Sequence, residues 1–165
     1  MKRGMTFSLI IAVLFVGIAP QALGYGHGTF SGRVVDSGVQ PERRPPTKIE
    51  LKVKGNKIKI TTVDLVLYCG GGATGFPTAT ATTGGAHGKI QKGVPSFPNQ
   101  GSFNFHDRVQ TTTSLGPATI GLLFTGSVLR NKVVGTVNAD TSLQPPDRDL
   151  LICDDEANFT AKKKG

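Results

Sequence analysis

Apolar side chains recur at every second position along most of this 165-residue chain, from Thr29 onward. Between residues 48 and 54, for example, Ile49, Leu51 and Val53 alternate with lysine and glutamate. A period of two places successive side chains on opposite faces of a β-strand, whereas an amphipathic helix repeats every 3.6 residues. No sustained helical repeat follows the first 24 residues. The chain is therefore predicted to form an all-β domain.

Two long hairpins are predicted from this alternation. Gly55-Asn56 accepts the positive φ of a tight turn and separates strands at residues 48–54 and 57–69. Arg130-Asn131 separates strands at residues 122–128 and 133–139 in the same way. Within the second strand the apolar positions change from even to odd, so we expect a β-bulge at Thr61-Thr62. Shorter strands are expected at residues 88–92, 102–108, 109–113 and 157–161, with a Gly/Thr/Pro-rich connection at residues 70–88.

Many short strands separated by turn residues favour a two-sheet antiparallel β-sandwich, of which a jelly roll is one form. A closed β-barrel is the alternative, because its strands also carry one polar and one apolar face. The length fits a single domain, since domains commonly hold about 100–150 residues. The 22 Gly and 10 Pro follow no triplet repeat, which excludes collagen.

Residues 1–24 have the pattern of a secretory signal peptide. Two basic residues precede an apolar run at residues 7–19, which is shorter than the roughly 20 residues that span a membrane. Ala22-Leu23-Gly24 supplies the small residues of a cleavage site, so we expect cleavage between Gly24 and Tyr25. The mature β-sandwich domain would then comprise residues 25–165 and have no stable membrane span. A leader retained as an anchor is the alternative.

Cys69 and Cys153 are the only two cysteines. Outside the reducing cytosol a lone pair is most simply a disulfide bond. The pair has neither the Cys-x-x-Cys spacing of a redox site nor the neighbouring histidines of a zinc site. We therefore predict a structural disulfide in a secreted or otherwise extracytoplasmic protein.

Acidic residues gather once, in a segment predicted to be a loop. Asp147, Asp149, Asp154 and Asp155 supply the oxygen ligands that Ca²⁺ prefers, which makes them weak calcium candidates. Their spacing fits no EF-hand loop, and Arg148 lies among them. A solvated loop is therefore the favoured interpretation, and no metal is expected.

Few residues suggest catalysis. His106-Asp107 is an adjacent base and acid, and with the acids of residues 147–156 it defines the alternative of a secreted hydrolase or carbohydrate-active domain. Gly70–Gly75 matches a nucleotide-binding glycine pattern but is not followed by a helix pattern. His27 is expected in a mobile N-terminus. No cofactor and no catalytic residue are predicted.

The chain is basic, with 19 Lys and Arg against 11 Asp and Glu. Lys52, Lys54, Lys57 and Lys59 fall on alternate positions around one turn, so they are expected on the solvent face of a hairpin. No aromatic residues are interleaved with these charges to stack bases, so nucleic acid is not expected as a partner. Affinity for an anionic cell surface is consistent with this pattern.

The residues that carry a resemblance are 28–32, the hairpin at 49–58, Cys69, the hairpin at 124–135, Cys153 and residues 159–161. On these the chain resembles a loose group of small exported bacterial β-sandwich proteins of unassigned function. The resemblance implies the fold and the disulfide, and it assigns no catalytic residue. Residues 40–46 depart from it. The expected function is a non-catalytic binding or structural role at the cell exterior, with a cell-surface polymer or carbohydrate as partner.

Overall fold

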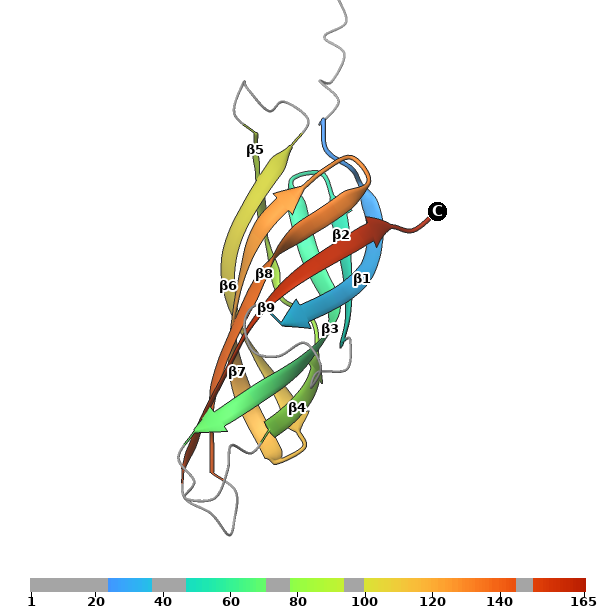
Figure 1. Ribbon diagram of the computed structural model, residues 1–165. Coiled ribbons are helices and arrows are strands. Elements are labelled where there is room, and N and C mark those ends of the chain that lie inside the picture. Colours follow the sequence, from blue (N-terminus) through green and yellow to red (C-terminus); the bar gives the residue numbers. More distant parts are fainter. Residues whose placement is uncertain (1–23, 37–46, 71–77, 94–99, 145–149) are drawn as a thin grey trace, which may run out of the picture.

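A computed structural model describes residues 24–36, 47–70, 78–93, 100–144 and 150–165 (Figure 1). These residues form strands and connecting turns, with no helix among them. The strands are β1 (Gly28–Asp36), β2 (Thr47–Lys54), β3 (Lys57–Gly70), β4 (Thr78–Thr83), β5 (His87–Lys92), β6 (Gly101–Thr113), β7 (Gly116–Val128), β8 (Lys132–Leu143) and β9 (Leu151–Lys163). The predicted all-β class is confirmed.

All nine described strands belong to one antiparallel sheet, in the order β2-β1-β9-β8-β7-β6-β4-β3-β5. Additional pairings join β2 to β3, β9 to β3, and β6 to β5. The pairing of β2 with β3 brings the strand order back to its beginning, so the sheet forms a hydrogen-bonded ring. The predicted division into two separate sheets is not confirmed.

The two predicted hairpins are confirmed. β2 and β3 pair around Gly55, whose φ is 59°, and β7 pairs with β8 around the turn at residues 129–131. The register between β2 and β3 shifts so that Glu50 faces Thr62 while Leu51 faces Ile60. Thr61 is therefore the extra residue of the predicted bulge, which returns the apolar side chains of β3 to the inner face.

Three elements differ from the prediction. β4 lies in the segment expected to be a connection. This strand was not predicted because its inward residues are alanines and a threonine rather than large apolar residues. β6 is one strand instead of two, because its inward positions from Phe105 to Thr111 are only partly buried and their alternation is weak. β9 begins at Leu151 rather than Ala157, so residues 151–156 of the acidic segment predicted to be a loop lie in a strand.

The inward side chains of all nine strands form one core. Phe30 and Phe124 are the largest fully buried side chains in it. The ring of Phe124 stacks on Phe105 at a centroid distance of 5.3 Å and meets the edge of Phe159 at 6.5 Å. Aromatic pairs at these separations stabilise a core beyond the area that they bury.

The predicted disulfide is confirmed. Cys69 on β3 and Cys153 on β9 are directly opposite in the register of these two strands, and their sulfur atoms are bonded. Both cysteines are fully buried. The bond links two cysteines that are 84 residues apart in sequence, at a place where three pairs of described residues join β3 to β9.

Gly32 allows two strands of the ring to approach closely. A Cβ at this position of β1 would overlap the backbone carbonyl oxygen of Thr160 on β9. We therefore expect Gly32→Ala to lower the free energy of unfolding by about 1–3 kcal/mol, because the backbone of β9 would have to move. Chemical denaturation measures the change.

The matched control for this prediction is Gly70→Ala. Gly70 also lies in a strand, and a Cβ there has no neighbour within 4 Å. Its effect should stay within about 0.5 kcal/mol. Equal effects of the two substitutions would contradict the close approach of β1 and β9.

Candidate functional site

The structure does not bring His106 and Asp107 together as a base and its acid. His106 and Asp107 are neighbours on β6, so their side chains leave opposite faces of the sheet. His106 is exposed, whereas the Asp107 carboxylate lies 3.5 Å from the Nδ1 atom of His87. The same carboxylate accepts a hydrogen bond from the backbone N–H of His87 at 3.3 Å. Asp107 is thus paired with a histidine that the sequence pattern did not single out.

The two calcium candidates that the structure describes, Asp154 and Asp155, lie on opposite faces of β9. Asp154 is exposed on the outer face of β9, and Asp155 is buried on the inner face, because adjacent strand residues point in opposite directions. Asp147 and Asp149 lie outside the described residues, as do the glycines at 71–75. Among the described residues no three His, Cys, Asp or Glu side chains are placed to hold a metal ion. Asp154 and Asp155 therefore do not face a common site, and the calcium candidates as a set of four stay a prediction.

The prediction of a mobile segment around His27 was wrong. Tyr25 is only 3% exposed and its hydroxyl donates to the Gly55 carbonyl at 3.3 Å. The Nδ1 atom of His27 accepts a hydrogen bond from the Gly55 N–H at 3.2 Å, and its ring stacks on that of Tyr25. On the other side, Gly26 donates to the Leu129 carbonyl at 3.0 Å. The residues that follow the predicted cleavage point therefore join the β2–β3 turn to the β7–β8 turn.

Burial raises the pKa of the Tyr25 phenol above its ordinary value. Because the folded-state pKa is the higher one, the unfolded chain loses this proton first, and stability should fall as the pH rises above about 10. The chain has two tyrosines and no tryptophan, so a Tyr68→Phe variant reports on Tyr25 alone. The phenolate absorbance of this variant should reach half of its full value only above pH 10. Half-ionisation at or below the ordinary value would contradict the burial of Tyr25.

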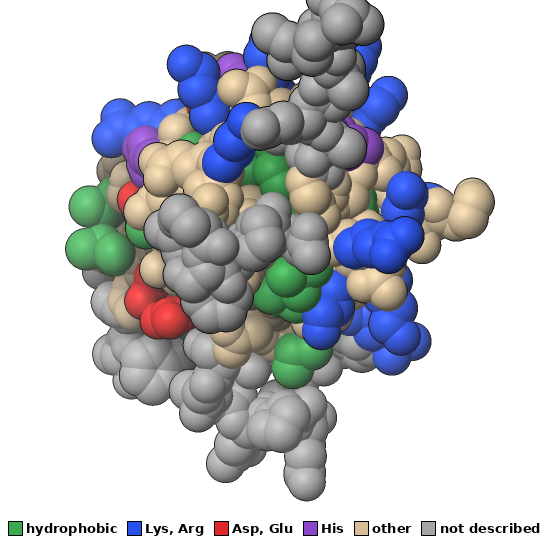
Figure 2. All heavy atoms as spheres, turned by 90° about the horizontal axis from the view of Figure 1, so that it is seen from above, with side chains coloured by type: hydrophobic (Ala, Val, Ile, Leu, Met, Phe, Trp, Pro, Cys, Tyr) green, Lys and Arg blue, Asp and Glu red, His purple; other side chains and the backbone are tan. Residues whose placement is uncertain are grey.

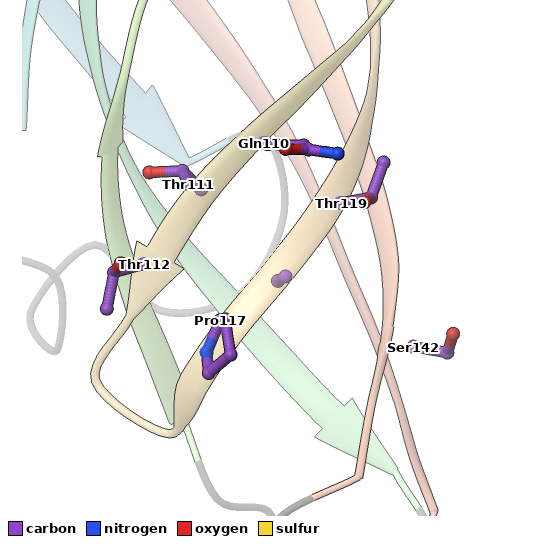
Figure 3. A pocket seen from close by; sticks show the side chains of 7 residues that line it. Gln110, Thr111, Thr112, Pro117, Thr119 and Ser142 are labelled. Carbon is purple, nitrogen blue, oxygen red and sulfur yellow. The ribbon is translucent and has the colours of Figure 1, made fainter.

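A shallow depression of about 630 Å³ lies on the lower part of β6, β7 and β8. Figure 3 shows Gln110 on β6, Thr119 on β7 and Ser142 on β8 around it. Its lining consists of Gln110, Thr111, Thr112, Pro117, Ala118, Thr119 and Ser142. These side chains offer hydroxyls and one amide, and none of them is charged or aromatic. The depression can hold water or a hydroxyl-bearing molecule, but it contains no acid, base or nucleophile pair.

Five exposed lysines form what we call the lysine patch, on the outer face of β2, β3 and β5. Strand register places Lys54, Lys57 and Lys89 opposite one another in one row. Lys52 and Lys59 form a second row, which continues to His87. Neighbouring strands are about 4.8 Å apart, so each lysine has like charges as nearest cross-strand neighbours. None of the five has an ion-pair partner within the described part of the chain.

Like charges directly opposite on neighbouring strands destabilise a sheet. The lysine patch therefore weakens the fold in the absence of a counter-charge and forms a strongly positive surface. Figure 2, which views the molecule from above, shows Lys and Arg side chains along much of the rim at this end. Alternation in the sequence predicted four of these lysines on a solvent face. Lys89 was missed, because only the pairing of β5 with β3 places it beside them.

The carboxylate of Glu50 on β2 lies beside the patch. Glu50 accepts a hydrogen bond from the Lys164 ammonium at 2.7 Å and lies 3.2 Å from that of Lys48. The hydrogen bond from Lys164, followed by that from Lys48, holds the pKa of Glu50 below its usual value. The charge of Glu50 is thus balanced by Lys48 and Lys164, which lie outside the lysine patch, so Glu50 does not neutralise the patch.

Comparison of the chain with protein-family models, with curated proteins and with solved structures finds no match. Over the residues that the structure describes, no helix has the length and apolar character needed to cross a membrane.

Proposed function

We propose that this is an exported, non-catalytic protein that binds an anionic partner at the cell exterior through the lysine patch. The observation that carries the proposal is the register of β2, β3 and β5, which places five lysines side by side. None of them has an ion-pair partner among the residues that the structure describes. Such an arrangement costs stability unless a counter-charge binds to it. A positive surface of this kind also raises the rate of encounter with anionic partners.

Two further observations support an exterior, non-catalytic role. A buried disulfide persists in oxidising compartments, and the leader pattern at residues 1–24 directs a chain to them. In the described residues, the one close histidine–carboxylate pair is His87 with Asp107, and the His87 side chain is 78% exposed. A solvated pair of this kind lacks the enclosed setting in which acid–base groups are tuned for catalysis.

The proposal is tested by binding of the purified exported protein to intact cells and to isolated envelope of the producing organism. Replacement of Lys54, Lys57 and Lys89 by glutamine should lower the affinity about tenfold, because each lost contact weakens binding by a few tenths to one kcal/mol. Binding of the wild type should also weaken steeply with salt, since exposed charges are screened.

The matched control is a triple variant with glutamine at Lys92, Arg108 and Arg130. It removes the same charge from positions outside the patch. Its affinity should stay close to that of the wild type. An equal loss in both triple variants would show that net charge alone matters, and this result would contradict the proposal.

A further inference from the structure

The lysine patch is one end of a longer row of cations on the outside of the ring. Lys52 faces Thr29 on β1, and the carbonyl of Thr29 accepts a hydrogen bond from the N–H of Lys164. Two residues along β1, Ser31 faces Lys162 of β9. Lys162 in turn faces Lys132 of β8. The Lys164 ammonium is already paired with Glu50. We therefore call the lysine patch together with Lys132 and Lys162 the basic band.

The basic band crosses β5, β3, β2, β1, β9 and β8, which are consecutive neighbours around the ring. Five strand spacings separate its ends, a path of about 24 Å along the surface. Six of the nine strands make up more than half of the ring, so the band bends around the molecule. A flat surface can contact only a part of it, whereas a flexible chain can follow all of it.

From this geometry we propose that the anionic partner is an acidic polysaccharide whose chain lies across the strands along the basic band. The inference rests on the proposed function, because it uses the same patch. β1 supplies the second reason: within the band it contributes the hydroxyls of Thr29 and Ser31 rather than cations. Cations interspersed with hydroxyls match a polymer that carries both carboxylates and hydroxyls.

Other polyanions fit the band less well. A membrane surface is usually bound with apolar side chains that enter the lipid, and the exposed large apolar residues of the described chain, Val35, Leu150 and Ile152, lie outside the band. Single-stranded nucleic acid is bound with aromatic side chains that stack on bases. No aromatic residue belongs to the basic band.

The experiment compares the affinity of the exported protein for short and long oligogalacturonates, the short ones covering only the lysine patch and the long ones exceeding the band. Long chains should bind at least about tenfold more tightly, because added contacts on one chain act together. Methyl-esterified chains, which keep the hydroxyls but lose the charge, should bind weakly.

Substitutions show where the bound oligogalacturonate lies along the basic band. Lys132→Gln with Lys162→Gln should weaken binding of long oligogalacturonate several-fold and leave that of short oligogalacturonate unchanged. Lys54→Gln with Lys57→Gln should weaken both. Arg108→Gln with Arg130→Gln, outside the band, should change neither.

Four results would overturn this inference. Affinity that does not depend on chain length, or on Lys132 and Lys162, would leave the lysine patch as a binding site but remove the extended path. Tighter binding to anionic lipid vesicles would assign the band to a membrane, and tighter binding to polyphosphate or an oligonucleotide of equal length would assign it to another polyanion. Loss of cell binding in the patch variant, together with no affinity of the wild type for oligogalacturonate, would reject only the acidic polysaccharide as the partner.

Failure of the proposed function itself would appear as cell binding that the patch variant does not change.

Discussion

Replacement of Phe124 by alanine is expected to lower the free energy of unfolding by about 3–5 kcal/mol. The Phe124 side chain is fully buried and contacts the rings of both Phe105 and Phe159. Its removal loses the free energy gained by transferring the ring from water to the core. It also leaves a cavity, which cannot close because β7 is hydrogen-bonded to a neighbouring strand on each side. Small domains have only about 5–15 kcal/mol of stability in total, so the variant should be close to unfolding.

Urea denaturation of the wild type and of Phe124→Ala measures this difference as a shift of the midpoint. Val35→Ala is the control, because Val35 is apolar and strand-borne but 53% exposed. Its effect should lie within about 0.5 kcal/mol. A mild effect of Phe124→Ala would mean that the inward face of β7 has been assigned to the wrong set of residues.

Loss of the disulfide is the second large effect that we expect. The double variant Cys69→Ala, Cys153→Ala should be less stable than the oxidised wild type by about 2–5 kcal/mol. In the chain-entropy model, a link across 84 residues lowers the entropy of the unfolded chain and so raises its free energy by about 4–5 kcal/mol. The bond also joins β3 to β9 where their pairing is short, so local opening there should increase.

The wild type in reducing agent is the matched comparison for the double variant. Its unfolding midpoint should approach that of the variant, because both lack the covalent link. An unchanged midpoint on reduction, with the thiols shown to be free, would contradict a structural role for the disulfide.

Local pattern predicted the hairpins well, because a tight turn and its two strands are adjacent in sequence. The bulge at Thr61 was also predictable, since the phase change of the apolar residues is visible directly. β4 was missed, because Ala79 and Ala81 bury little area and give a weak apolar signal. The ring itself rests on pairings between distant segments, such as β1 with β9, and no local pattern specifies these.

The candidate site was predictable in part for the same reason. Alternation placed Lys52 and Lys59 on a solvent face, which the structure confirms. Their continuation to Lys89, and around the ring to Lys132 and Lys162, depends on which strands become neighbours. The buried Tyr25 was missed because it follows a leader pattern and lies beside His27, in the N-terminus that was expected to be mobile. An aromatic residue between two glycines was the available signal.

Our main proposal is that the chain is processed and oxidised outside the cytosol to give the disulfide-closed all-β domain. It is tested most directly by the intact mass of the protein recovered from the cell exterior, measured with and without reduction and thiol labelling. We predict a chain that begins at Tyr25 and takes up label on Cys69 and Cys153 only after reduction. A chain found in the cytosol that keeps residues 1–24 and takes up label at both cysteines without reduction would contradict the account.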